Sequence, residues 1–389
     1  PAAGGESAVV ISGPACLGRQ AWYTSPNSQE TLAVSRLTPN PDNRLTVDLS
    51  ALEANLAACR ALLPGGMRVA GVVKADAYGH GLLPVARRLK AAGAEALAVG
   101  VAAEGRRLRR EGIAGGIFLL LGARPEQARQ VVADDLTPVC ADLEIFQALS
   151  AAAQALGRTA TCQLKVDTGM TRLGVAPGQV LELLERLAVL PGLRVTGLVS
   201  HLATAGDPAS EQARRQSAVF AELLHAARAR GHALADSSLA GSGGALAPPP
   251  ASPGAPAYAR LGIVLYGGLP DPASAGRADL RGVMSYRSRL LAVRPAPAGS
   301  AVSYGATWVA PRDTWLGVVP VGYSDGYLRA ASNRAAMLVG GRLAPVRGRV
   351  CMNLTVIDLE GFDPLPQVGD EVVLLGRQGR AEISADQLG

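Results

Sequence analysis

Between residues 45 and 268 short apolar runs alternate with amphipathic stretches, and this alternation limits the possible folds more than any other feature. Short apolar runs bounded by turn residues indicate strands buried on both faces, whereas stretches such as 180–187 repeat apolar residues at helical spacing. Eight strands are expected, at 69–74, 96–100, 117–121, 136–140, 161–166, 195–200, 236–240 and 261–265. Strands joined by helical crossovers predict an α/β fold, a closed parallel (β/α)8 TIM-like barrel. An open doubly wound sheet also alternates, but it more often has a Gly-x-Gly-x-x-Gly loop after its first strand, which is absent here.

The pattern changes after residue 268. Short β-like stretches at 290–293, 316–321, 336–339 and 371–375 are separated by Gly, Pro and Asp turns, with few helical patterns between them. At 389 residues the chain also exceeds what one hydrophobic core usually supports. We therefore predict a barrel domain over 44–268 and a C-terminal β-rich domain over 269–389.

Residues 1–43 are predicted to be an N-terminal extension of unknown role. They are rich in Pro, Gly, Ser, Asn and Thr, and they lack the charged start and long apolar region of a secretory signal. The chain opens on Pro1 instead of methionine, so both upstream processing and a fragment stay open.

Charge and composition exclude several classes of partner. The formal net charge is +6, but arginines lie among acids, as in 104–111, which glutamates bracket and which we expect to form a solvated helix face. With 4% aromatic residues and no basic stretch interleaved with them, nucleic-acid binding is not expected. No apolar segment approaches the roughly 18 residues that a membrane span needs. We expect a soluble protein, with no membrane partner, that binds small anionic ligands.

The cysteines and histidines show no metal-ligand spacing. The five cysteines are widely spaced without a Cys-x-x-Cys pair, at positions 16, 59, 140, 162 and 351. Neither a disulfide framework nor a zinc site is indicated, so no metal is expected and a reducing cytoplasm is the expected compartment.

Lys74 is the first candidate for chemistry, because it ends the apolar run of the first strand and precedes Gly79 and Gly81. We expect a buried, partly desolvated side chain there, which favours the neutral amine that attacks a carbonyl to form a Schiff base. The glycines would let backbone N–H groups approach an anion closely.

In such a barrel, chemistry gathers at the carboxyl ends of the strands. The residues that follow or flank later strands are Arg172, His201, Ser242, Arg260 and Tyr266. A lysine for imine formation, glycine-flanked N–H groups for a phosphate, a histidine able to stack and arginines for anions together suit pyridoxal phosphate.

Six segments resemble, in order, the motifs of alanine racemases, the pyridoxal-phosphate-dependent amino-acid racemase family of fold type III. They are 73–81, 165–174, 260–267, 303–308, 322–327 and 348–352, and the resemblance runs from about residue 44 to the end. It implies catalytic roles for two residues: Lys74, which would hold the cofactor and act as the base on the D-alanine face, and Tyr304, which would be the base on the L-alanine face.

The resemblance also implies roles for residues around these two bases. Tyr78, Ser242, Gly262 and Ile263 would hold the phosphate, His201 would stack near the pyridine ring, and Arg260 would face the pyridine nitrogen. Arg172 and the backbone of Met352 would bind the substrate carboxylate, and Tyr323 would support the site. Lys165 matches the position that many members carry as a carbamylated lysine supporting that arginine.

The implied function is two-base interconversion of L-alanine and D-alanine, which supplies D-alanine for peptidoglycan. Removing the α-proton on one face and returning a proton on the other requires two bases on opposite sides. In the family, the tyrosine of the β domain reaches the lysine of the other subunit, so the resemblance implies a homodimer with shared active sites.

Two departures and two alternatives stand beside this reading. The chain stops at Gly389, whereas members continue with a further phosphate-binding tyrosine, so we expect either a fragment or a weaker grip on the cofactor. Asn353 stands where relatives commonly have aspartate, which leaves open a broader range of small amino-acid substrates such as serine.

Two alternative functions were weighed against the racemase. A pyridoxal-phosphate carrier without racemase activity would lack the β domain, and a basic amino-acid decarboxylase would need a different phosphate loop and an active-site cysteine.

Overall fold

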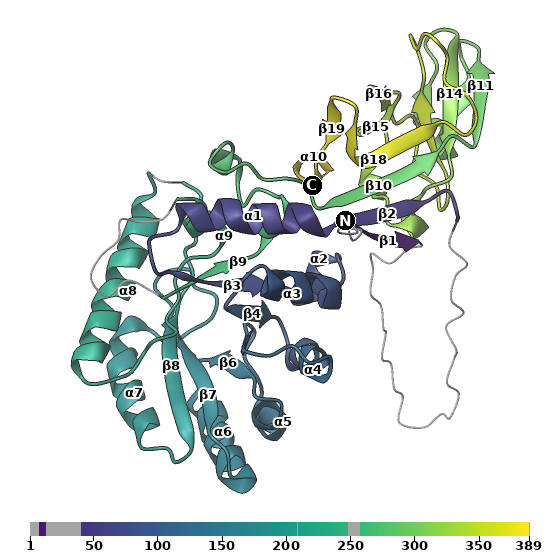
Figure 1. Ribbon diagram of the computed structural model, residues 1–389. Coiled ribbons are helices and arrows are strands. Elements are labelled where there is room, and N and C mark those ends of the chain that lie inside the picture. The colour runs from purple at the N-terminus through teal and green to yellow at the C-terminus, as the bar shows by residue number, and fades with distance from the viewer. Residues whose placement is uncertain (1–7, 13–39, 208, 248–256, 389) are drawn as a thin grey trace, which may run out of the picture. The chain divides into compact units, whose positions relative to one another are not determined.

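The computed structural model describes residues 8–12, 40–207, 209–247 and 257–388 (Figure 1). It divides into two compact units, one formed by residues 51–281 and the other by residues 1–50 together with 282–389. The first unit is the barrel and the second is the β-rich unit.

The barrel unit is built on seven parallel strands in the order β8-β7-β6-β5-β4-β3-β9. Their bounds are β3 Arg68–Val72, β4 Ala96–Val99, β5 Gly116–Leu119, β6 Thr137–Cys140, β7 Ala160–Lys165, β8 Leu193–Val199 and β9 Tyr258–Leu261. Ser238 forms single parallel bridges to Val199 of β8 and to Tyr258 of β9, which closes the ring between its two edge strands. The predicted fold class, a (β/α)8-like barrel with a β-rich C-terminal part, is confirmed.

Two of the predicted strands are wrong in detail. The strand expected at 236–240 is reduced to Ser238, because the Ser237 and Ser238 hydroxyls bond to the backbone of Leu198 and Tyr258, in competition with a regular ladder. The strand expected at 261–265 ends at Leu261, and Ile263–Tyr266 form a buried 3-10 turn, η3. Periodicity alone does not separate a short buried strand from a short buried helical turn.

Helices cover the outside of the barrel strands (Figure 1). Their bounds are α1 Leu49–Leu62, α3 Leu82–Ala91, α4 Ala102–Arg110, α5 Ala128–Ala133, α6 Leu143–Leu156, α7 Val180–Ala188 and α8 Glu211–Ala229. Strands β4 and β6 are buried along their whole length, as expected for parallel strands covered on both faces. Small side chains such as Ala70, Ala96 and Ala98 pack with Phe118 and Tyr258 in one buried cluster.

The β-rich unit contains a mainly antiparallel sheet in the order β1-β2-β10-β18-β15-β16, with β19 paired to β18. The strands are β1 Ala8–Ser12, β2 Arg44–Asp48, β10 Met284–Arg289, β15 Ala336–Val339, β16 Arg342–Pro345, β18 Glu371–Gln378 and β19 Ala381–Ile383. A second sheet joins β11 Ala292–Ala296, β14 Thr314–Val319 and β17 Thr355–Asp358, and β12 Ala301–Val302 pairs with β13 Trp308–Val309. The core of this unit is formed by buried aliphatic residues such as Val319, Met337, Ile357 and Val372.

Strand β2 lies in the β-rich unit although it precedes the barrel in sequence, because it pairs with β10 in antiparallel register, Val47 opposite Met284. Most of the predicted N-terminal extension lies outside the described residues, apart from β1 and residues 40–43. The predicted ranges 1–43, 44–268 and 269–389 stay predictions as functional domains.

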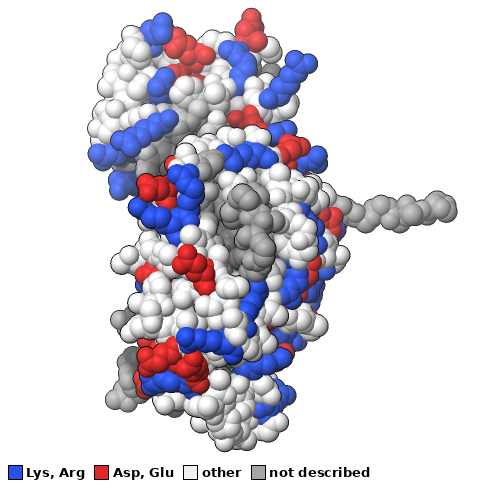
Figure 2. Space-filling view, turned by 90° about the vertical axis from the view of Figure 1, so that its left-hand side faces the viewer, with Lys and Arg blue, Asp and Glu red and all other residues white. Residues whose placement is uncertain are grey.

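The surface carries mixed charge. On the face shown in Figure 2, lysine and arginine side chains lie among aspartate and glutamate side chains. In the described part of the chain, no helix has both the length and the apolar character needed to cross a membrane.

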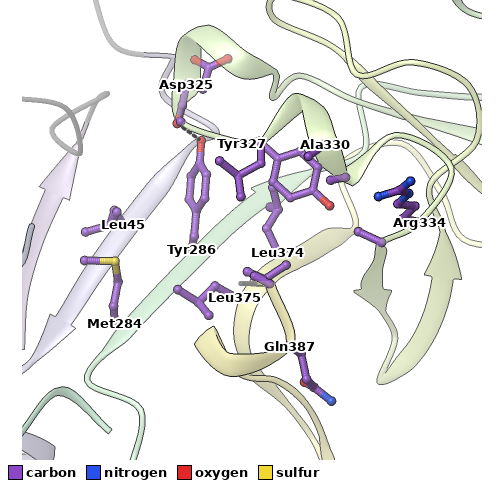
Figure 3. A pocket seen from close by; sticks show the side chains of 15 residues that line it. Leu45, Met284, Tyr286, Asp325, Tyr327, Ala330, Arg334, Leu374, Leu375 and Gln387 are labelled. Carbon is purple, nitrogen blue, oxygen red and sulfur yellow. Dashed lines mark hydrogen bonds between the residues drawn. The ribbon is translucent and has the colours of Figure 1, made fainter. Parts of the chain in front are cut away.

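The β-rich unit also contains a mainly apolar cavity of about 500 Å³ (Figure 3). Leu45, Met284, Leu374 and Leu375 contribute much of its lining. The Tyr286 hydroxyl donates to the Asp325 carbonyl at 3.3 Å, whereas the buried Tyr327 hydroxyl has no hydrogen-bond partner among the described residues. None of the residues predicted to take part in catalysis or binding lines this cavity.

Candidate active site

The barrel unit contains a cavity of about 480 Å³ beside the segments that follow β3, β7, β8 and β9. The nine residues of this unit to which the resemblance assigns a role all line it: Lys74, Tyr78, Lys165, Arg172, His201, Ser242, Arg260, Gly262 and Ile263. Tyr266, Gly79 and Gly81, the other candidates from the sequence, do not line it, and the Gly79 and Gly81 N–H groups donate to the Ala75 and Asp76 carbonyls instead of facing the cavity. The structure therefore brings together residues that are far apart in the sequence, at the strand ends where barrel chemistry is expected.

Lys74 begins a left-handed turn, labelled α2 (Lys74–Tyr78), two residues after β3 ends. The four residues from Ala75 to Tyr78 have φ between 54° and 57°. For side chains larger than glycine this conformation costs roughly 1–2 kcal/mol per residue, and such strain is concentrated at functional sites. The Lys74 ammonium lies 5.9 Å from the centre of the Tyr78 ring.

The expectation that Lys74 is buried is wrong for the single chain, in which its side chain is exposed. The apolar run 69–73 is buried, but β3 ends at Val72, and the lysine leaves the strand on the turn. Its amine therefore lines an open cavity instead of the barrel core.

Tyr78 is held by ring packing. Its ring lies 4.7 Å from that of Tyr266, and His80 packs on Tyr266 at 4.6 Å. The Tyr266 hydroxyl donates to the Val72 carbonyl at 2.9 Å, which ties the ring pair to the end of β3. Burial raises the pKa of both tyrosines, so their hydroxyls stay protonated donors at neutral pH. Tyr266 was predicted to lie at the site because it flanks the last expected barrel strand, whereas no role was predicted for His80.

Tyr78, Ser242 and Gly262 converge at one end of the cavity. The Gly262 N–H donates to the Ser242 hydroxyl at 2.9 Å, at the start of the short helix α9 (Ser242–Leu246). A Cβ on Gly262 would lie 2.6 Å from the Tyr78 hydroxyl oxygen, so only glycine allows this approach. Two hydroxyls and a backbone N–H at a glycine-lined position form a donor set that suits a phosphate.

Arg260 on β9 is buried and donates hydrogen bonds from both of its terminal NH2 groups. It bonds to the Ser200 carbonyl at 2.6 Å, to the Leu239 carbonyl at 3.3 Å, to His201 Nδ1 at 3.1 Å and to the Ser238 hydroxyl. Burial lowers its pKa to about 10, so the guanidinium remains charged at neutral pH. A guanidinium cannot accept, which assigns Nδ1 of His201 as the acceptor and its ring proton to Nε2.

His201 is neutral. Its burial, followed by the nearby charges of Arg260, Lys165 and Arg172, lowers its pKa to about 3. A Cβ on Gly241 would lie 2.7 Å from His201 Cε1, so the ring rests directly on that glycine. The imidazole therefore does not act as a cation, and its stacking near a cofactor ring stays a prediction.

Lys165 ends β7 beside the loop that carries Arg172. Burial, followed by repulsion from Arg260 and Arg172, lowers the pKa of Lys165 to about 7. One oxygen of Asp167 accepts the N–H groups of Gly169, Met170 and Thr171 at 2.9 to 3.0 Å, which fixes the loop before Arg172. The guanidinium groups of Arg172 and Arg260 line the same cavity as the partly neutral amine of Lys165, so this part of the cavity suits the binding of a carboxylate.

The other three predicted residues belong to the β-rich unit. Tyr304, Met352 and Tyr323 are exposed there, at 71%, 56% and 47%. Their loops lie together, because the Tyr323 N–H donates to the Cys351 carbonyl at 3.0 Å and the Ser303 hydroxyl donates to the Arg349 carbonyl at 2.6 Å. Large exposed side chains gathered on adjacent loops are typical of a binding surface.

The sequence profile described as "Alanine racemase, N-terminal domain" matches residues 47–270, and "Alanine racemase, C-terminal domain" matches residues 283–389. The chain belongs to the alanine racemase family. The family resemblance predicted from the motifs is confirmed, and so is the prediction that the chain is an enzyme, a racemase of this family.

Relatives align with this chain over most of their own length. Alanine racemases from Syntrophobacter fumaroxidans and Nitratidesulfovibrio vulgaris are 39% and 41% identical, over 88% of this chain and 90% and 91% of theirs. The structure of the alanine racemase from Streptomyces coelicolor A3(2) is similar with a TM-score of 0.81 at 37% identity, covering 88% of this chain and 90% of that one.

The sequence did not predict a role for Glu104, which was expected to lie on a solvated helix face. In the structure its carboxylate accepts a hydrogen bond from the Ala75 N–H, in the turn that follows Lys74.

Proposed function

We propose that this member interconverts L-alanine and D-alanine with pyridoxal phosphate, using Lys74 and the Tyr304 of a partner subunit as its two bases. The observation that carries the proposal is the gathering of Lys74 and the Tyr78, Ser242 and Gly262 donors in one cavity. The family assignment supports the reaction, and the relatives' names supply its substrate.

The residues present fit pyridoxal phosphate. The amine of Lys74 and the donor set at Gly262 both line the 480 Å³ cavity, and the close approach at Gly262 leaves no room for a side chain. In this assignment Tyr78, Ser242, Gly262 and Ile263 hold the phosphate, His201 packs near the ring, and Arg260 faces the ring nitrogen. When bound, the group supplies an electron sink that makes the substrate α-proton acidic.

The side chains of this enzyme then bind the substrate and move protons. Arg172 and the backbone of Met352 bind the substrate carboxylate, and Lys165 and Tyr323 support that site. Lys74 removes or returns the α-proton on the D face, and Tyr304 does so on the L face. Arg260 would face the ring nitrogen and donate a hydrogen bond to it. Because its guanidinium stays charged at neutral pH and is too weak an acid to transfer a proton, it would leave that nitrogen unprotonated.

The same proposal includes a homodimer with two shared sites, a cytoplasmic location and a role in supplying D-alanine for peptidoglycan. The exposure of Tyr304 and Met352 on the β-rich unit supports a shared site, since both side chains are free to meet another subunit. Widely spaced cysteines support a reducing compartment.

Incubation in deuterated water tests the reaction directly. Purified protein with pyridoxal phosphate should incorporate solvent deuterium at the α-carbon of each alanine enantiomer, with inversion, in both directions. Chiral chromatography coupled to mass spectrometry reads both the label and the configuration. Cofactor binding without α-exchange in alanine or serine would contradict the proposal and leave a cofactor carrier.

The second candidate is a wider substrate range, and it rests on the identity of Asn353. Asn353 donates to the Ser324 hydroxyl at 2.7 Å, and that hydroxyl donates to the Met352 carbonyl at 2.8 Å. Asn353 is thus linked through Ser324 to the backbone of Met352, which we assign to binding of the substrate carboxylate. Its side chain is a neutral amide at a position where relatives commonly carry a charged aspartate. Serine in the deuterium experiment decides between strict and broader specificity.

Lys165 gives a prediction with a defined pH dependence. Its amine is protonated below its pKa of about 7 and neutral above it, and only the neutral amine combines with carbon dioxide. In bicarbonate, a carbamate on Lys165 should therefore be present at pH 8 and lost as the pH falls through about 7. Carbon-13 NMR with labelled bicarbonate measures it, and Lys90 is an internal control because its ammonium donates to the Ala94 and Glu95 carbonyls. A carbamate signal that persists in Lys165→Met would refute the assignment.

A further inference from the structure

We propose that Glu104 is a positioning residue that holds the turn carrying Lys74 in its reactive conformation. The inference rests on the proposed function, in which the Lys74 amine links the cofactor and moves the proton. Glu104 acts through that turn and takes no part in proton transfer itself.

Glu104 lies on α4 and bonds to two different loops. Its Oε1 accepts the Ala75 N–H at 2.6 Å, and its Oε2 accepts the Gly100 N–H at 2.8 Å and the Val101 N–H at 3.3 Å. The carboxylate therefore links the turn after β3 to the loop after β4. With both oxygens accepting backbone N–H groups, it is not placed to exchange a proton.

The Ala75 N–H needs an acceptor from outside the turn. Within the turn, the Ala77 N–H donates to the Val73 carbonyl and the Gly79 N–H donates to the Ala75 carbonyl. The first N–H groups of a helical turn have no such partner, and Ala75 has a left-handed φ of 54°. A charge-assisted hydrogen bond to a carboxylate is the stronger kind, and it stabilises a conformation that alanine otherwise avoids.

The contact extends to the lysine itself. A Cβ on Gly100 would lie 3.3 Å from Glu104 Oε2 and 3.7 Å from Lys74 Cβ. Glu104, Gly100 and the base of the Lys74 side chain are therefore packed in one place. A shift of the carboxylate would release the backbone on which Lys74 starts.

Glutamine at position 104 separates this role from general helix stability. An amide keeps the size of the side chain but offers one oxygen and one NH2 group, so it cannot accept from both loops. Glu111→Gln is the matched control, because Glu111 follows α4 and only pairs with Arg87 at 2.9 Å on the exposed surface.

Amide hydrogen exchange of the whole chain is the first measurement. In Glu104→Gln, exchange at Ala75 or Gly100 should accelerate on the order of tenfold, while Glu111→Gln should match the wild type. Unchanged exchange at both amides would overturn the proposal. This readout does not depend on the cofactor or on activity.

The second measurement is the rate at which added pyridoxal phosphate becomes bound to Lys74, followed by its visible absorbance. Glu104→Gln should slow this rate and kcat on the order of tenfold with little change in KM and in thermal midpoint, and Gly100→Ala should give a milder form of the same effect. A lower thermal midpoint with normal cofactor attachment would show a merely structural role and refute positioning. If the wild type itself attaches no cofactor at Lys74, the proposed function fails, and the amide exchange still decides whether Glu104 holds the turn.

Discussion

Lys74→Ala is expected to lower the racemisation rate by roughly 10³-fold or more and to remove the visible absorbance of lysine-bound pyridoxal phosphate. The substitution removes the amine that attaches the cofactor and the base on one face of the substrate. The loss should appear in both reaction directions, because each direction uses both bases once.

The chain offers an unusually simple control, since its lysines are Lys74, Lys90 and Lys165. Borohydride reduction of the loaded protein followed by peptide mapping therefore has three possible outcomes. The label should fall on Lys74, and Lys90→Arg should keep both the label and the activity. A label on Lys165, or absorbance that survives in Lys74→Ala, would contradict the assignment of the cofactor lysine.

The sequence predicted the barrel because its strand runs are apolar throughout and its helices repeat at helical spacing. Six of the eight strands lie where they were expected. The rule that barrel chemistry gathers at strand ends selected Lys74 and five later residues, and all of these except Tyr266 line one cavity. The cofactor and the roles of individual residues came from the resemblance. Periodicity alone would have supported only a barrel with a candidate lysine.

Three features of the site could not be predicted from sequence patterns. The left-handed turn from Ala75 to Tyr78 contains alanine and aspartate, so no run of glycines signals it. Lys74 looked buried because an apolar run precedes it, but the chain leaves the strand just before it. Glu104 looked like part of a solvated face because its bonds go to backbone N–H groups that have no sequence signature.

Mixing Lys74→Ala with Tyr304→Phe subunits is expected to restore activity that neither variant has alone. If each site takes its lysine from one chain and its tyrosine from the other, a mixed dimer contains one site with both bases and one site with neither. With free exchange at equal amounts, half of the dimers are mixed, so activity should recover to about a quarter of the wild type. Native mass spectrometry of differently tagged subunits measures the exchange alongside the activity.

The reverse mixture makes the test independent of any residual activity. A chain with both substitutions, mixed in equal amount with wild-type chains, should halve the activity per wild-type chain, because each mixed dimer has a defect in both sites. If lysine and tyrosine of one site came from the same chain, this mixture would lose nothing and the first mixture would stay inactive. Shared sites therefore predict a gain of activity in the first mixture and a loss in the second. If the subunits exchange but the first mixture stays inactive and the second loses no activity, shared sites are ruled out.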